Sequence, residues 1–224
     1  MDSTRSSTML ETFRRSFCPI EALEPRALLA VNPVIQGGKT YDSAFATAAS
    51  PDGSYVVAGI FSGTAGFGSG PGAATFTSSG DTDFYVAKYS ASGSLLWVKQ
   101  FGGDAGELDQ DGFIDCAIDP GRAEDFDEGV GVQSLQLGEY VNAVACDSAN
   151  NIYVTGAFRG TVDFNPGPKQ TIITSTDGDK YLDIYFLKLS PSGGIVYAKQ
   201  LGGEFTDLAQ SIAVDSAQNV YLTG

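Results

Sequence analysis

The chain repeats itself over long segments. DFYVAKYSASGSLLWVKQFGG at residues 83–103 returns one hundred residues later as DIYFLKLSPSGGIVYAKQLGG. A second segment occurs three times, as TAASPDGSYVVAG, VACDSANNIYVTG and IAVDSAQNVYLTG, ending at Gly59, Gly156 and Gly224. Self-similarity of this length is typical of supersecondary units that bury their apolar faces only by stacking on neighbouring units. The repeats therefore constrain the fold more than any local motif.

The sequence of each repeat unit predicts four strands that are joined as two hairpins. Residues 144–147 and 152–158 are short and rich in Val, Ile, Tyr and Ala, and the Asp and Asn residues between them favour a turn. Residues 184–189 and 195–200 predict a second hairpin, in which Gly193 supplies the positive φ of a tight reversal. Gly93 has the same position in the earlier copy.

The strand at residues 184–189 is apolar on both faces. Ile184 and Phe186 lie on one side, and Tyr185, Leu187 and Leu189 on the other, so both sides require cover. This pattern favours an all-β fold with β-propeller-type repeats of four-stranded antiparallel blades. The propeller is incomplete, with about two and a half blades. A β-solenoid is the alternative, although its coils are usually shorter and lack paired hairpins.

The repeat boundaries divide the chain into five parts. An N-terminal segment (1–33) precedes a first blade (34–103), an acidic insertion (104–139), a second blade (140–207) and the start of a third (208–224). The outer faces, with residues such as Trp97, Phe186 and Tyr197, would meet water in so short an array. We therefore expect further blades of a longer chain, or other copies, as partners.

The repeats resemble a known family. VDSAQNVYLTG, GTVDFNPGP at residues 160–168 and the segment at 183–203 are similar to the bacterial β-propeller repeat called SBBP, over roughly residues 41–224. VDSAQNVYLTG is also similar to NHL repeats. The SBBP resemblance implies an exported or surface-attached bacterial protein.

The first 33 residues form a different kind of segment. IEALEPRALL at residues 20–29 resembles the short LEPR-XLL segment near the start of large exported bacterial proteins. This resemblance implies a largely disordered targeting segment; a tail with no targeting role is the alternative. Charged residues and Pro25 interrupt its apolar stretches, unlike a Sec signal peptide. No stretch approaches the ~20 apolar residues of a transmembrane segment.

The composition is acidic. The chain has 13 Lys and Arg against 27 Asp and Glu, and beyond residue 40 the counts are 8 and 23. Such a surface argues against nucleic acid as a partner, because phosphate binding needs basic patches. Calcium, a cationic cell-wall component or a polysaccharide surface suits it better, and solubility outside the cell is the alternative reason for the acidity.

The insertion contains the candidate metal site. Eleven acids and a single base lie between residues 104 and 139. Glu107, Asp109, Asp111 and Asp115 place oxygens at alternate positions around Gly112, as in the first nine positions of a calcium loop. The twelfth position is Ile118, which offers no carboxylate, although Asp119 follows it. A solvated acidic loop without metal is the alternative.

Turn residues 163–167, DFNPG, place Asp163 and Asn165 two positions apart. They are a second cation candidate, and an Asx turn is the favoured interpretation.

Catalysis is not predicted in this segment. The chain has no histidine, which removes the commonest general base. Asp83, Asp183, Lys88 and Lys188 recur at equivalent places, which favours structural roles as turn caps and ion pairs. We expect an exported or cell-surface protein with a structural, adhesive or ligand-binding role. The alternative is a fragment of an extracellular carbohydrate-active enzyme whose catalytic residues lie outside this chain.

The three cysteines form neither a disulfide framework nor a zinc motif. Cys146 is expected in a strand as a small core residue. Cys18 lies in the N-terminal segment. If that segment were removed, Cys116 and Cys146 would be the pair left to form a bond in an oxidising exterior.

Overall fold

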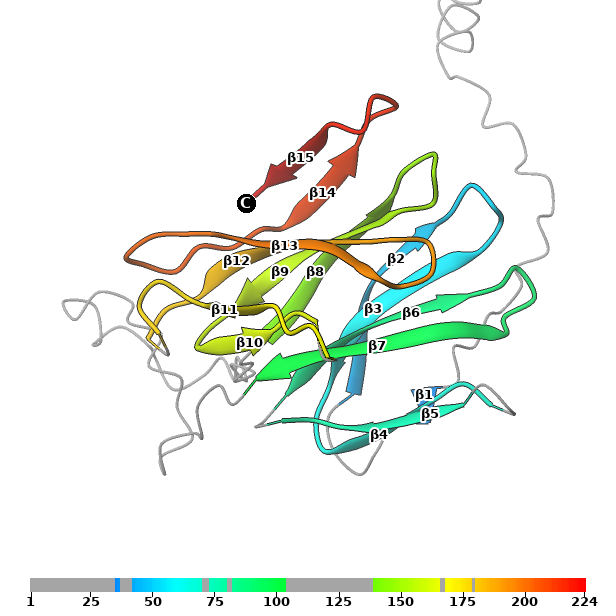
Figure 1. Cartoon of the computed structure of the whole chain (residues 1–224), viewed down its shortest axis with the longest axis horizontal. Helices are drawn as coiled ribbons and strands as arrows, with labels where there is room; N and C mark the ends of the chain where they lie inside the picture. The colour runs from blue at the N-terminus through cyan, green and yellow to red at the C-terminus, as the bar shows by residue number, and fades with distance from the viewer. Residues whose placement is uncertain are drawn as a thin grey trace, which may run out of the picture. The chain divides into compact units, whose positions relative to one another are not determined.

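Antiparallel strands account for all of the regular secondary structure in the part of the chain that the structure describes (Figure 1). This structure is a computed structural model, and it describes residues 35–36, 42–69, 73–79, 82–103, 139–165, 168–178 and 180–224. These residues contain no helix, and their open sheets have two to six strands. The predicted all-β fold, with incomplete propeller-like repeats, is confirmed.

Each complete blade is a four-stranded antiparallel sheet made of two hairpins. The first blade has the order β7-β6-β3-β2 and the second β13-β12-β9-β8, while β14 and β15 form only the first hairpin of a third. Glu139, which we had placed in the insertion, is the first residue of β8. The bounds are β2 Asp42–Ala49, β3 Tyr55–Phe61, β6 Asp83–Tyr89, β7 Leu95–Gly103, β8 Glu139–Cys146, β9 Ile152–Phe158, β12 Asp183–Leu189, β13 Ile195–Leu201, β14 Ser211–Val214 and β15 Val220–Thr223.

A further hairpin, which the sequence did not predict, lies between the two hairpins of each blade. It comprises β4 (Thr64–Phe67) and β5 (Ala74–Thr77) in the first repeat unit, and β10 (Thr161–Asp163) and β11 (Ile172–Thr174) in the second. We call it the linking hairpin, because β10 also pairs with β7 of the preceding blade and so produces the six-stranded sheet.

The short strand β1 (Ile35–Gln36) pairs with the linking hairpin of the first repeat unit. Its Gln36 lies opposite Gly66 of β4, and in the second repeat unit Gly102 of β7 lies opposite Asp163 of β10. Gly66 and Asp163 are equivalent positions of the two repeat units. β1 therefore pairs with the first linking hairpin in the same way as the end of β7 pairs with the second.

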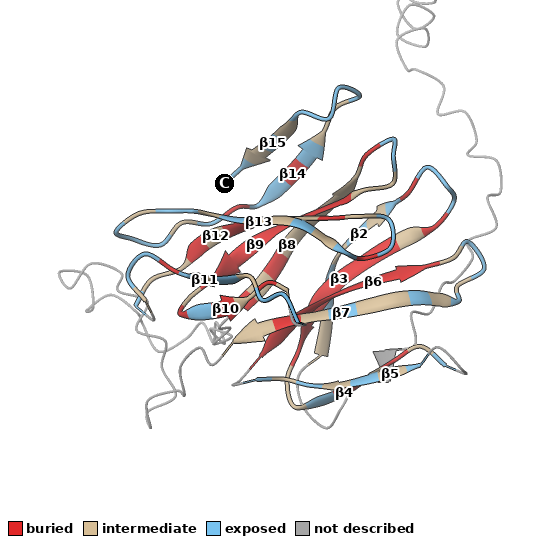
Figure 2. Cartoon of the chain, in the orientation of Figure 1, coloured by how far each residue is buried: buried red, intermediate tan, exposed pale blue. Residues whose placement is uncertain are grey.

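Most of the core lies between the two complete blades (Figure 2). Val56 and Phe84 of the first blade pack with Val154, Tyr185 and Leu187 of the second, and all five are fully buried. On the opposite face of β12, residues 184, 186 and 188 are only half-buried. The start of the third blade covers this face of the sheet only in part, because β14 lies against β8 and β9.

Aromatic rings join the two blades. Phe84 stacks on Phe101 of its own blade and on Tyr185 of the next, with centroid separations of 4.7 Å in both cases. Phe164, just beyond β10, lies 6.1 Å from Phe84 and 5.3 Å from Tyr185. Stacked and tilted rings at these separations attract one another beyond the effect of burial alone. The linking hairpin therefore contributes both backbone pairing and an aromatic side chain to the joint.

We expected Trp97 to lie on an open face, but it does not. Its indole N–H donates to the carbonyl of Pro191 at 3.1 Å, and Gly193 leaves room for the ring. Phe186 and Tyr197 are half-buried like Trp97, but their rings lie 5.4 Å apart on the partly covered face of the second blade.

The turns of the first hairpins explain the repeated Asp-Ser-Ala segment. Asp147 Oδ1 accepts from the backbone N–H of Asn151 at 2.9 Å, and Oδ2 accepts from the Tyr153 hydroxyl at 3.0 Å. Asp215 makes the same bonds with Asn219 and Tyr221, at 2.8 and 3.1 Å. Each turn also has one residue with positive φ: Gly53 at 82°, Asn150 at 63° and Gln218 at 65°.

Gln218 is the least suited of these three residues to a positive φ, because Gly and Asn tolerate this region and other side chains are strained there. We predict that Gln218→Asn will stabilise the β14–β15 hairpin by about 1 kcal/mol. Slower amide hydrogen exchange in β14 and β15 would report this change. The reverse substitution, Asn150→Gln, should destabilise the β8–β9 hairpin, and unchanged exchange in both variants would contradict the prediction.

Candidate functional site at the open edge of the second blade

The predicted calcium ligands Glu107, Asp109, Asp111 and Asp115 lie outside the described residues. The calcium site therefore stays a prediction. In the described part of the chain, no group of three or more His, Cys, Asp or Glu side chains is placed to hold a metal ion.

Cys146 is a free, half-buried thiol that packs against the core between the blades. It accepts a hydrogen bond from Ser50 Oγ at 3.3 Å, and burial raises the pKa of the thiol. Cys18 and Cys116 lie outside the described residues, so a Cys116–Cys146 bond stays untested.

The repeated acids Asp83 and Asp183 are buried turn caps, as predicted. Asp83 accepts from the backbone N–H of Ser79 at 3.1 Å, and Asp183 accepts from that of Thr176 at 2.6 Å. Each also accepts from the side-chain amide of the glutamine in the neighbouring strand, Gln100 or Gln200.

The glycines that follow these glutamines make room for the acids. A methyl group on Gly102 would lie 2.0 Å from Asp83 Oδ1, and one on Gly202 would lie 2.3 Å from Asp183 Oδ1. The repeated KQ(F/L)GG segment thus accommodates a buried carboxylate in each blade.

The two equivalent lysines differ. Lys88 is buried and forms an ion pair with Asp52, with 3.4 Å between Nζ and Oδ2. Lys188 instead lies over the ring of Tyr153, at 4.8 Å from its centroid. The predicted ion pair is therefore confirmed for Lys88, and Lys188 makes a cation–π contact in its place.

The second cation candidate is an Asx turn. Asp163 Oδ1 accepts from the backbone N–H groups of Asn165 and Thr171, both at 2.9 Å. Because backbone donors occupy this oxygen, the favoured interpretation as a turn is confirmed.

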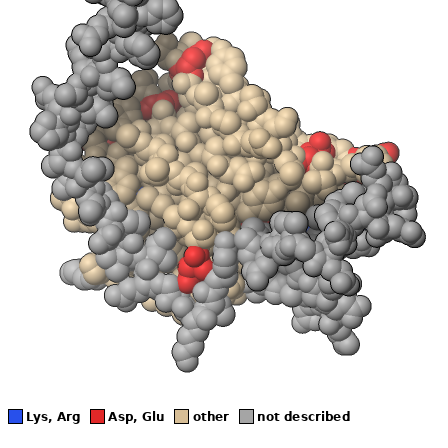
Figure 3. Space-filling view, turned by 180° about the vertical axis from the view of Figure 1, so that it is seen from behind, with Lys and Arg blue, Asp and Glu red and all other residues tan. Residues whose placement is uncertain are grey.

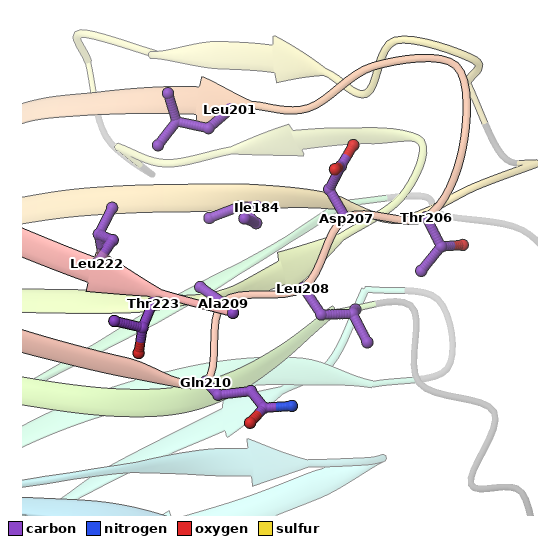
Figure 4. Close-up of a pocket in the computed structure, with 10 residues that line it drawn as sticks. Ile184, Leu201, Thr206, Asp207, Leu208, Ala209, Gln210, Leu222 and Thr223 are labelled. Carbon is purple, nitrogen blue, oxygen red and sulfur yellow. The ribbon is translucent and has the colours of Figure 1, made fainter.

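A pocket of about 490 Å³ opens where the second blade meets the start of the third (Figure 4). Ile184 of β12, Leu201 at the end of β13 and Leu222 of β15 supply apolar side chains. The connection from β13 to β14 lines the pocket with residues 206–210, and Thr223 and Gly224 complete the lining. Leu201 is 47% exposed, although its equivalent in the first blade, Phe101, is fully buried.

The polar groups of the pocket fix the connection in place. Asp207 Oδ2 accepts from the backbone N–H of Gly203 at 2.8 Å, and the backbone N–H of Asp207 donates to the carbonyl of Leu182 at 2.7 Å. The side-chain amide of Asn142 donates to the carbonyl of Ala209. The pocket thus has a mixed lining, and Ile184, Leu201 and Leu222 give it an apolar part that suits an apolar or aromatic side chain.

Our sequence reasoning did not find this pocket. Its residues come from the ends of repeat units, where no single motif stands out. A usable signal was present, because Asp42 and Glu139 open β2 and β8 just before a bulge, and Asp207 occupies the equivalent position of the third repeat unit.

One face of the described surface carries acidic and no basic side chains (Figure 3). The face drawn in Figure 3 shows scattered carboxylates and no Lys or Arg among its described residues. No helix in the described ranges has the length and apolar character needed to cross a membrane.

One comparison with known proteins finds a match. A family model described as SBBP, beta-propeller repeat, matches residues 196–224. The match begins within β13 and runs through β14 and β15, so it spans the junction between blades and includes most of the residues that line the pocket. A β-propeller repeat is therefore present in the chain. No curated protein matches it.

Gly103, the last residue of β7, and its equivalent Gly203, two residues beyond the end of β13, provide a matched test of the joint. A methyl group on Gly103 would lie 1.8 Å from the carbonyl oxygen of Thr161 in β10, whereas one on Gly203 would have no neighbour nearer than Asp207 Oδ2 at 4.0 Å. We predict that Gly103→Ala lowers the free energy of unfolding by about 2–4 kcal/mol, and that Gly203→Ala changes it by less than about 1 kcal/mol. Urea denaturation of both variants checks this, and equal losses would contradict it.

The raised pKa of the buried Asp83 carboxyl predicts that the free energy of unfolding depends on pH. Burial raises the pKa of this carboxyl from 3.8 to about 6, although hydrogen bonds from Gln100 and Ser79 oppose the shift. Because the folded pKa lies above the unfolded value, the stabilisation is present below about pH 4 and is lost as the pH rises through about 6. The loss should reach about 3 kcal/mol at most. Comparing the denaturation of wild type and Asp83→Asn between pH 4 and 7 isolates this contribution.

The control for this titration is Asp147→Asn. Hydrogen bonds from Asn151, Tyr153 and Ala149 lower the pKa of Asp147 against the opposing effect of burial. Its contribution is therefore present above about pH 4 and disappears as the pH falls below that value, which is the opposite sign. If the difference between wild type and Asp83→Asn stays constant from pH 4 to 7, the carboxyl of Asp83 has an ordinary pKa.

Proposed function

We propose that this chain is part of an exported or cell-surface β-propeller repeat protein with a structural, adhesive or ligand-binding role, and that this segment is not catalytic. The observation that best supports this proposal is how the repeated polar side chains are used. Asp83, Asp183, Asp147 and Asp215 all accept hydrogen bonds from turns within their own repeat unit. Groups engaged in this way stabilise blades and leave binding to loops and edges.

The proposed location rests on the sequence. The LEPR-XLL-like segment at residues 20–29, the SBBP similarity and the excess of acids all suit a protein outside the cell. A polysaccharide or cell-wall surface is the proposed partner, with calcium as the proposed cofactor. The remaining candidate is a fragment of an extracellular carbohydrate-active enzyme, with its catalytic residues outside this chain.

Export can be tested in a bacterial host with a C-terminally tagged chain. The full chain should reach the medium or become sensitive to protease added outside the cell, and a variant without residues 1–33 should remain inside. Equal distribution of the two proteins would refute the targeting role of that segment. Incubating the exported protein with cell-wall polysaccharides then separates retention on the polymer from release of soluble sugars, which would favour the enzyme.

Calcium binding has its own prediction. If Asp109, Asp111 and Asp115 hold calcium, millimolar calcium should raise the melting temperature, because a ligand that binds only the folded state stabilises it, by about 2.7 kcal/mol at one hundred times Kd. Magnesium should have a smaller effect. Replacing the three aspartates with asparagine should abolish the shift.

The matched control neutralises Asp125, Asp127 and Glu128, which removes the same charge from the same insertion. That variant should keep the response to calcium. A melting curve that is identical in calcium and in chelator would leave the insertion as a solvated acidic loop.

A further inference from the structure

The joint between the first two blades needs the outer half of the second repeat unit. This outer half consists of the linking hairpin (β10 and β11) and of strands β12 and β13. Val162 and Asp163 of β10 pair with Gly103 and Gly102 of β7. Behind this pairing, Phe164 and Tyr185 pack on Phe84, and these rings together with Phe101 are fully buried. All the residues that cover the first blade here lie between residues 160 and 203.

The third repeat unit begins the same joint again. In the second unit, a methyl group on Gly156 would lie 1.8 Å from the carbonyl oxygen of Tyr140, and in the third, one on Gly224 would lie 1.8 Å from that of Leu208. The hairpin of β14 and β15 therefore shares this close backbone approach with that of β8 and β9. It is also placed alike, because β14 lies against β8 as β8 lies against β2.

The outer half of this second joint is open. Ile184 and Leu201 occupy the places of Phe84 and Phe101, and both line the pocket. Leu201 is 47% exposed where Phe101 is fully buried. In the sheets of the described residues, β13 is an edge strand, whereas β7 has a partner on each side.

The space around Gly203 differs from that around the equivalent glycines. Gly102, Gly103 and Gly202 are each required to be glycine by an atom within about 2 Å of the missing methyl group. At Gly203 the nearest such atom is 4.0 Å away, so nothing in the described residues excludes a side chain there. Its equivalent, Gly103, is glycine because a carbonyl of the next linking hairpin approaches it.

We propose that Gly202 and Gly203, directly after the end of β13, and the adjoining pocket bind the outer half of a further repeat unit. A linking hairpin equivalent to β10 and β11 pairs with this edge. An aromatic residue equivalent to Phe164 and a tyrosine equivalent to Tyr185 fill the pocket against Ile184 and Leu201. This assignment is independent of the proposed surface role.

A whole second copy does not fit this site unchanged. Its first blade would bring its own inner hairpin, β2 and β3, to the face of β8 and β9 on which β14 already packs. An occupant without an inner hairpin avoids this overlap. The outer half of a repeat unit, represented in this chain by residues 157–203, meets that requirement and carries both aromatic residues.

The test extends the full chain by appending a second copy of residues 157–203 directly after Gly224. Because Gly224 is equivalent to Gly156, this fusion completes the third unit in register. We expect amide hydrogen exchange at Gly202 and Gly203 to slow by at least about tenfold relative to the 224-residue chain. The melting temperature should rise as well.

Gly203→Ala in the original copy is the decisive variant. It should leave the 224-residue chain unchanged, yet remove the slowed exchange from the fusion, because its methyl group would meet the carbonyl of the docked hairpin. The same substitution at the equivalent glycine of the appended copy, which again lies at a free edge, is the matched control and should have no effect. A second variant replaces the appended equivalents of Phe164 and Tyr185 with alanine and should also lose protection.

Three results would overturn the proposal. The first is exchange at Gly203 that is the same in the fusion and in the 224-residue chain. The second is a fusion that keeps its protection with Gly203→Ala. The third is a concentration-dependent dimer of the unextended chain that protects Gly203, which would make this edge an interface between whole copies.

Discussion

The architecture depends on one joint, in which a short hairpin from one repeat unit is inserted at the edge of the blade before it. The linking hairpin of β10 and β11 adds backbone pairing at Gly102 and Gly103 and places Phe164 beside Phe84 and Tyr185. Burying a side chain of this size contributes about 1.5–3 kcal/mol, and a ring pair adds about 0.5–1.5 kcal/mol. Because the rings come from two repeat units, neither blade can bury them alone.

Two sets of polar side chains fix the turns of the repeat units. In the second and third units an aspartate of the first hairpin accepts from the turn and from a tyrosine hydroxyl, whereas the first unit has Ser50 at this position. In both complete blades a buried aspartate accepts from the backbone just after the linking hairpin and from a glutamine. These bonds satisfy partly buried backbone donors that would otherwise destabilise the fold. Their recurrence along the chain thus follows from blade construction, and side chains that do not recur are the better candidates for function.

The sequence predicted the parts of the fold that depend on local chemistry. Short apolar segments between turn residues predicted the four strands of each blade, and Gly93, Gly193 and Asn150 have the positive φ angles that their turns need. The linking hairpins were missed because their strands have only three or four residues and one of their partners lies in another repeat unit. The pocket was missed for a related reason: it is defined by what Leu201 lacks in comparison with Phe101, and a sequence does not show which equivalent positions are covered.

The equivalent lysines show how successive blades can differ and still stack. Lys88 is almost fully buried and needs a counter-charge, which Asp52 supplies from the first hairpin of the same blade. In the second blade Ala149 stands where Asp52 would be, and Tyr153 replaces Val56, so that a ring lies under Lys188. In both blades a side chain of the same blade's first hairpin stabilises the positive charge of the lysine. No charge from the neighbouring blade is therefore required. A repeat unit can therefore change the chemistry at this position without a compensating change in the unit that packs on it.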